Sequence, residues 1–104
     1  MNRMKVLILT SWENVKSEEG LKKYYKWQDE NRPYWIERRK KYNVKTQGWG
    51  DGTGLMYMTD ELDSFEDYAK FQDDEEFQKS FIDFCRLVKN AKVKVLRGGI
   101  QAPP

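Results

Sequence analysis

Histidine is absent from this 104-residue chain, and cysteine occurs only once, as Cys85. The chain therefore lacks the commonest general base and the commonest metal ligand of proteins. Neither a Ser-His-Asp triad nor a zinc site of cysteines and histidines can be built from it, and we expect no cofactor. A single cysteine forms no disulfide within the chain, which favours the reducing cytoplasm as its compartment.

Long apolar runs are absent as well. No stretch approaches the roughly 20 apolar residues of a membrane-spanning helix, so we expect no membrane partner. The run Val6–Leu9 is too short for the apolar region of a signal peptide and leads directly into polar residues. The length fits one domain, which we assign to residues 1–97, followed by a flexible tail or dimer arm over residues 98–104.

The formal net charge of +2 hides an uneven distribution of charge. Residues 18–45 contain nine basic and five acidic residues, whereas residues 60–83 contain ten acidic and two basic residues. These two segments can attract each other within a subunit or across a dimer. The basic run Arg38–Lys41 is compatible with nucleic-acid phosphates, but a solvated helix C-terminus explains it equally well. The acidic second half would repel a polyanion, so we expect no nucleic-acid partner.

Hydrophobic periodicity predicts a strand and then a long helix in the first half of the chain. Lys5–Trp12 alternates as a strand does, and Leu21–Tyr42 carries apolar residues at helical spacing after an N-cap at Ser17. Pro33 interrupts this helix. The helix either kinks at the proline or ends near Glu30, in which case a second helical piece begins at Pro33.

Two strands joined by a turn are predicted next. Val44–Trp49 and Gly54–Asp60 form a hairpin in this interpretation, because the Asp-Gly pair within Gly50–Thr53 is a strong turn signal. The glycines also suggest a phosphate-binding loop. That loop requires a Lys-Ser/Thr pair and a following helix, whereas a strand follows here.

The second half of the chain predicts two helices and a last strand. Capping boxes that begin at Ser64 and Asp73 start a short helix through Phe71 and a longer amphipathic helix. The apolar stripe of the longer helix reaches Val88, and Lys92–Arg97 is the last strand.

Two features of these helices invite a chemical interpretation. The acids at positions 73–76 could hold a metal ion, but acids at a helix start serve capping first, and we predict no metal site. Cys85 lies on the apolar stripe, so we interpret it as a buried small hydrophobe rather than a nucleophile.

The order of these elements is β-α-β-β-α-β, the ferredoxin-like arrangement of the α+β class. Right-handed crossovers place both helices on one face of a four-stranded antiparallel sheet. The other face should be polar, yet Leu7 and Leu9 oppose Val6 and Ile8 in the first strand. An exposed apolar face of this kind calls for a cover, and a second copy of the sheet is the simplest one. We therefore predict a homodimer.

The segment Ser64–Phe71, followed by Asp73–Phe77, carries a family resemblance. It contains a short helix, an acidic break and an amphipathic helix entered by a Glu-Phe pair. From about Lys5 to Arg97 the chain resembles the dimeric α+β-barrel superfamily, in particular its antibiotic-biosynthesis-monooxygenase-like and NIPSNAP-like branches. The resemblance implies a barrel of two sheets and a pocket between helices and sheet in each subunit. Branches that rely on a histidine do not match this chain, and no catalytic set aligns residue by residue.

Aromatic residues supply the candidate ligand site. Tyrosine and tryptophan side chains can form the wall of a pocket for a small apolar or aromatic molecule and add directional donors. The alternative is that they are core and dimer contacts. The candidate ligand-binding residues are Trp12, Tyr24, Trp27, Asn31, Trp35, Trp49 and Tyr57.

Asn31 and Trp35 are the catalytic candidates in a second hypothesis, a metal-free and cofactor-independent oxygenase of phenolic or quinol-like substrates. In that reaction side-chain donors hold the substrate anion. Asn31 can instead cap a helical piece that starts near Pro33. A third hypothesis is a purely structural or interaction module, for which a pocket filled by the protein's own side chains would be the sign.

Overall fold

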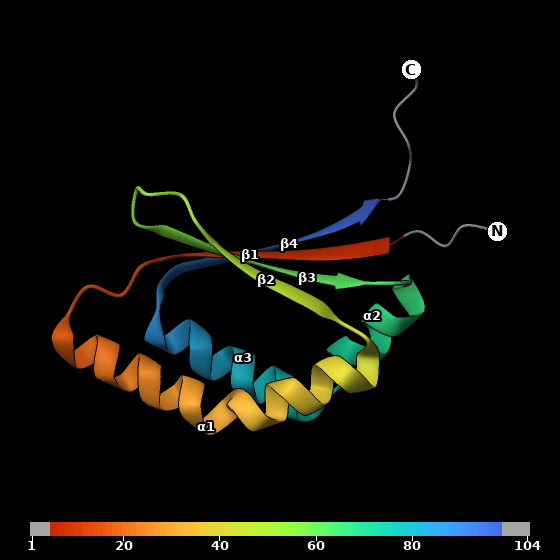
Figure 1. Ribbon diagram of the computed structural model, residues 1–104, viewed down its shortest axis with the longest axis horizontal. Helices are drawn as coiled ribbons and strands as arrows, with labels where there is room; N and C mark the ends of the chain where they lie inside the picture. Colours follow the sequence, from red (N-terminus) through yellow and green to blue (C-terminus); the bar gives the residue numbers. More distant parts are fainter. Residues whose placement is uncertain (1–4, 99–104) are drawn as a thin grey trace, which may run out of the picture.

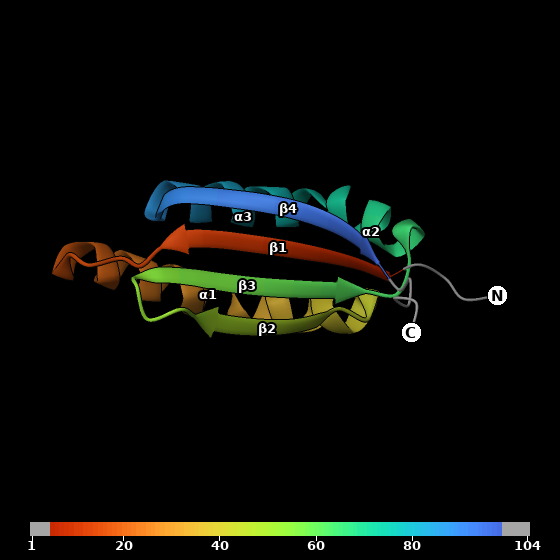
Figure 2. The ribbon, with the colours of Figure 1, turned by 90° about the horizontal axis from the view of Figure 1, so that it is seen from above.

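Four antiparallel strands form one sheet in the order β2-β3-β1-β4, as Figure 2 shows. The computed structural model describes residues 5–98. The central strand β1 (Lys5–Glu13) pairs with β3 (Leu55–Leu62) and with β4 (Lys89–Gly98). The other edge strand, β2 (Lys45–Gly50), pairs with β3. The predicted hairpin and the predicted four-stranded antiparallel sheet are confirmed.

The three helices of the described residues lie on one face of this sheet (Figure 1). Helix α1 (Glu18–Tyr42) lies beneath β2 and β3, and α3 (Glu75–Leu87) lies beneath β4, with the short α2 (Phe65–Gln72) at one end (Figure 2). The ferredoxin-like α+β fold is therefore confirmed, with its second helical segment divided into α2 and α3. No helix within residues 5–98 combines the length and apolar character needed to cross a membrane.

Several boundaries differ from those predicted. Strand β4 begins at Lys89 rather than Lys92, because a bulge opposite Ser11 and Glu13 lets the chain pair earlier, with Asn90 at a φ of 55°. Gly98, assigned to the tail, ends β4 opposite Lys5. The rest of the predicted tail, residues 99–104, lies outside the described residues.

Helix α1 continues through Pro33 and bends near its middle, with its concave side toward the sheet (Figure 1). Proline removes a helical hydrogen bond and crowds the preceding turn, which is the usual cause of such a bend. Of the two alternatives for this segment, the kinked helix is correct. Asn31 caps no second piece, because its Nδ2 donates to the carbonyl oxygen of Trp27 at 2.8 Å, one turn back in the same helix.

The two faces of the sheet differ in what covers them. On the helix face Val6 and Ile8 are buried. On the open face Leu7 and Leu9 of the central strand are half-buried, although none of the helices within residues 5–98 lies over them (Figure 1). Strand alternation adds to that face three exposed apolar side chains, Trp49, Leu55 and Leu96.

Asp74 joins α1 to the start of α3. It is the N-cap of α3, and its Oδ1 accepts from the backbone N–H groups of Glu76 and Phe77. The predicted N-cap, Asp73, is instead the C-cap of α2. From α1, Arg38 Nη2 lies 3.0 Å from Asp74 Oδ1. Two tyrosines of α1 also donate to this carboxylate, Tyr34 at 2.9 Å and Tyr42 at 3.2 Å.

These contacts govern the ionisation of Asp74. Burial opposes the charged form, but hydrogen bonds from Tyr34 and the Phe77 N–H and the charge of Arg38 outweigh it and lower the pKa of Asp74 to about 2. Burial and the hydrogen bond to Asp74 raise the pKa of Tyr34. The carboxylate is therefore the charged partner and the phenol the neutral donor.

We predict that Asp74→Ala lowers the free energy of unfolding by about 3 kcal/mol, because it leaves the buried Arg38 charge without its partner. Chemical denaturation at pH 7 measures the change. Asp73→Ala is the matched control, since Asp73 is exposed, and we expect a change within about 0.5 kcal/mol. Equal effects of the two substitutions would contradict the assignment.

The pH dependence of the same pair has a definite sign. Because folding lowers the pKa of Asp74 from 3.8 to about 2, its stabilisation is fully present above pH 3.8 and is lost as the pH falls toward 2. The difference in unfolding free energy between wild type and Asp74→Ala should shrink over that interval.

Candidate functional site

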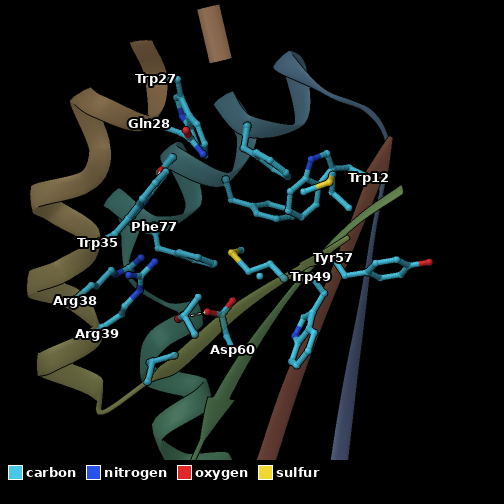
Figure 3. Close-up of a pocket in the computed structure, with 18 of the residues that line it drawn as sticks. Trp12, Trp27, Gln28, Trp35, Arg38, Arg39, Trp49, Tyr57, Asp60 and Phe77 are labelled. Atoms are coloured by element: carbon cyan, nitrogen blue, oxygen red, sulfur yellow. Dashed lines mark hydrogen bonds between the residues drawn. The ribbon is translucent and has the colours of Figure 1, made fainter. Parts of the chain in front are cut away.

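A cavity of about 600 Å³ lies between α1, α3 and the helix face of the sheet (Figure 3). Helix α1 packs against α2 and α3, and its concave side faces the cavity. The sheet contributes Trp12, Met56 and Met58, which strand alternation turns toward the helices. The walls are therefore largely apolar.

Four predicted ligand-binding residues line this cavity from the helix face of the fold: Trp12, Tyr24, Trp27 and Trp35. Their rings form one connected wall. Trp27 lies 4.7 Å from Trp35 and 5.3 Å from Phe84, and Trp12 meets Phe84 edge-on at 5.0 Å, between ring centroids. The Trp35 indole also donates to Ser80 Oγ at 3.1 Å, which fixes its orientation.

Trp49 and Tyr57 border the cavity, but their side chains lie on the other face of the sheet. Trp49 on β2 pairs with Tyr57 on β3, and Tyr57 lies between Met56 and Met58 in the strand, so its side chain points to the face opposite theirs. Figure 3 shows both rings directed away from α1. Trp49 is 55% exposed, and the Tyr57 hydroxyl donates to Asp51 at 3.2 Å. Asn31, bonded to its own helix, is not among the lining residues.

The charged part of the lining was not predicted from the sequence. Arg38, assigned to a solvated helix end, is only 4% exposed. Its Nη2 contacts Asp74 and, at 3.4 Å, the carbonyl oxygen of Phe71. Arg38 follows Trp35 by three positions, so it shares a helical stripe with Trp27 and Trp35. That spacing is the signal that could have identified it.

Aromatic rings enclose the Arg38 guanidinium. Its central carbon lies 4.5 Å from the ring centroid of Phe77, 4.8 Å from that of Phe71 and 5.0 Å from that of Tyr34. Cation–π attraction offsets part of the cost of burying this charge. Within residues 5–98, Nε and Nη1 of Arg38 and Nε1 of Trp27 are buried donors without a hydrogen-bond partner.

Asp60 faces Arg38 and Arg39 across the cavity from strand β3 (Figure 3). It is 8% exposed and accepts a hydrogen bond from Thr46 Oγ1 at 2.6 Å. Burial raises the pKa of Asp60, while the Thr46 bond and the charge of Arg39 oppose that increase. Asp60 shares its face with Met56 and Met58, and this alternation was the available sequence signal.

Other candidate features have structural explanations. In the turn between β2 and β3, Asp51 Oδ1 accepts from the N–H and hydroxyl of Thr53, while Gly52 and Gly54 adopt positive φ. Cys85 packs beside the cluster of Trp12 and Phe84, and burial raises the pKa of its thiol. Within residues 5–98 no group of three or more potential Cys, Asp or Glu ligands could hold a metal ion.

Comparison with known proteins finds solved structures of the same fold. No protein-family model and no curated protein matches the chain. A dimeric ferredoxin-like protein from an uncultured marine organism is similar in structure, with 20% identity, a TM-score of 0.59, and coverage of 98% of this chain and 100% of that chain. A NIPSNAP family protein of unknown function from Agrobacterium tumefaciens has 16% identity, a TM-score of 0.52, and coverage of 98% and 94%.

An enzyme shares the fold as well. Hydroxynitrile lyase from Passiflora edulis has a TM-score of 0.64 at 10% identity, with coverage of 99% of this chain and 100% of that chain. At these identities the likeness concerns the fold alone. These structural likenesses confirm the ferredoxin-like fold that the resemblance to the dimeric α+β-barrel superfamily implied.

We predict that Asp60→Asn makes the protein more stable than wild type at pH 8 and that the gain diminishes as the pH falls toward 4. Folding raises the pKa of Asp60 above its ordinary value of 3.8. The contribution of Asp60 to stability is therefore fully present below pH 3.8 and is lost as the pH rises through the pKa of the folded state. Urea unfolding of both proteins at pH 4, 6 and 8 measures the difference. In a Thr46→Val background the difference in unfolding free energy between Asp60→Asn and Asp60 should be larger, because the hydrogen bond that favours the Asp60 carboxylate is lost. A difference that does not change with pH would contradict a raised pKa of Asp60.

Proposed function

We propose that the protein is a homodimeric α+β-barrel protein of the cytoplasm that binds a small, flat, largely apolar molecule in the cavity between α1 and the sheet. The observation that carries the proposal is the aromatic-lined cavity of about 600 Å³. Small-molecule sites typically measure about 300–1,000 Å³ and are lined mainly by apolar side chains. Protein interiors otherwise pack closely, so a space of this size supports a ligand site rather than an ordinary core.

The wall formed by β2 supplies an entrance. The alternation that turns Trp49 outward turns Gly48 and Gly50 toward α1. A Cβ added at Gly48 would meet no atom within 4 Å, and one at Gly50 would meet only the Met56 sulfur at 3.6 Å. The two glycines therefore leave this edge of the cavity without side chains, which supports entry of a ligand between β2 and α1.

No observation favours the oxygenase alternative. Its proposed amide donor, Asn31, bonds to the backbone of α1 instead of lining the cavity. The activity of the hydroxynitrile lyase with this fold gives no support for the same reaction here, because fold does not transfer chemistry. The interaction-module alternative required a pocket filled by the protein's own side chains, and the side chains of residues 5–98 leave the cavity open.

We predict that Gly48→Leu weakens binding of a neutral aromatic probe, N-phenyl-1-naphthylamine, about tenfold or more, because leucine projects into the entrance. Fluorescence titration measures the affinity. Gln47→Leu is the matched control, since it adds the same side chain one residue away on the open face. Trp27→Ala, which removes part of the wall, should also weaken binding, whereas Tyr25→Ala on the exposed side of α1 should not.

Two results would count against the cavity as the site. One is a probe that binds the wild type and both leucine variants equally. The other is a failure of the probe to bind the wild type at all, together with native mass spectrometry of the freshly purified protein that detects no extra mass.

The dimer in this proposal rests on the open face of the sheet. Leu7 and Leu9 lie there on the central strand, and Trp49, Leu55 and Leu96 extend the apolar surface to both edges. A second copy of the same face would bury all of them. The dimeric ferredoxin-like protein of the marine organism has the same fold, which supports this arrangement.

We predict that Leu9→Lys shifts the protein from dimer to monomer at micromolar concentration, because it removes a central apolar side chain of the open face and adds a second positive charge beside its cross-strand neighbour Lys94. Light scattering coupled to size-exclusion chromatography measures the mass. Ile36→Lys adds the same charge at an apolar residue that is 46% exposed on α1, so it should remain dimeric. A monomeric wild type would refute the proposed dimer and leave the cavity proposal standing.

A further inference from the structure

The cavity has two chemically different ends. Figure 3 shows Trp12 and Trp27 near one end, while Arg38, Arg39 and Asp60 lie near the other. We propose that the ligand is an aromatic carboxylate, whose ring lies against the tryptophans and whose carboxylate lies at the Arg38 and Arg39 end. This inference rests on the proposed function and specifies the class of ligand.

Arg38 supplies the first argument. Its side chain is 3% exposed, and the bond to Asp74 and the contact with the Phe71 carbonyl both use Nη2. Within residues 5–98, Nε and Nη1 have no acceptor. Buried polar groups in folded proteins nearly always have a partner, and a charged donor gains most from a carboxylate. The unfilled donors of a buried arginine in a cavity lining therefore point to an acceptor on the ligand.

The balance of charge supplies the second argument. The charged residues that line the cavity are two arginines and one aspartate. Asp74 offsets the charge of Arg38, but that carboxylate is also shared with two tyrosine hydroxyls and two backbone N–H groups. Asp60 accepts a hydrogen bond from Thr46 and also feels the charge of Arg39, although no direct ion pair joins Arg39 to another described residue. The two arginines and two carboxylates at this end therefore balance formally. Arg39, which acts on Asp60 through its charge without a direct ion pair, is the cation that a ligand carboxylate would meet.

The tryptophan end of the cavity favours an aromatic ring as the rest of the ligand. Trp12, Trp27, Met56 and Phe84 offer flat or flexible apolar surface, on which an aromatic ring packs better than a branched chain. The unpartnered Trp27 Nε1 adds one donor near this end. A carboxylate attached directly to a two-ring aromatic system combines both requirements in one planar molecule.

The test compares three probes that share one naphthalene ring system: 2-naphthoate, its isosteric amide 2-naphthamide, and 2-methylnaphthalene. Calorimetry or quenching of tryptophan fluorescence in the full chain at pH 7.5 measures their affinities. We expect 2-naphthoate to bind about tenfold or more tightly than the amide and the hydrocarbon. Equal binding of the three would overturn the carboxylate inference and leave the proposed function intact. Binding of none would overturn both.

Variants at the charged end separate a ligand contact from an ordered water molecule that satisfies Arg38. Arg39→Gln should reduce affinity for 2-naphthoate to that for the amide and leave affinity for 2-methylnaphthalene unchanged. Arg38→Lys retains the charge beside Asp74 but removes the two unpartnered donors, and it should act in the same direction. Lys40→Gln, an exposed neighbour, is the control.

Folding of each variant is checked by circular dichroism. If Arg38→Lys does not fold, Arg39→Gln and the three probes decide the question. Unchanged affinity for 2-naphthoate in Arg39→Gln would mean that the carboxylate does not lie at this end of the cavity, with water as the partner of Arg38, and would overturn the inference.

Discussion

The ion pair between Arg38 and Asp74 is the constraint on which the rest of the structure depends. It places a guanidinium that is 3% exposed against the N-cap of α3, at the point where α1, α2 and α3 meet. Burying such a pair costs solvation energy and is favourable only when geometry and further hydrogen bonds are good. Here the hydroxyls of Tyr34 and Tyr42 donate hydrogen bonds to the Asp74 carboxylate, and aromatic rings enclose the Arg38 guanidinium. The pair thereby fixes the second half of α1 relative to α3.

This fixed point and the bend at Pro33 together shape the cavity. One half of α1 is held at Asp74, and the bend directs the concave side of the helix toward the sheet (Figure 1). The sheet wall opposite is thin where Gly48 and Gly50 face α1. Because the same arginine both locks the helices and lines the cavity, the charge of the site is built into the packing of the fold and is not an addition to its surface.

Local patterns in the sequence were sufficient for the fold but not for the site. The alternation of Lys5–Trp12 and the helical spacing of Leu21–Tyr42 are decided by neighbours in the chain, so they could be predicted. The candidates Trp49 and Tyr57 border the cavity from the open face of the sheet. The sequence could not show this, because strand alternation shows which residues share a face, while tertiary packing decides which face the helices cover. Arg38 was missed because its burial depends on Asp74, 36 positions further along the chain.

Strand alternation also explains how one small sheet can serve a cavity and a dimer together. On β2 and β3, Gly48 and Met58 face the cavity, whereas their neighbours Trp49 and Tyr57 face the open side. Each strand thus supplies alternate residues to the two proposed interfaces, and apolar side chains on both sides follow directly. A sheet that served only a core would need them on one face alone. The two-sided apolar pattern is therefore what the two proposed contacts, with a ligand on one face and with a second copy on the other, would together require.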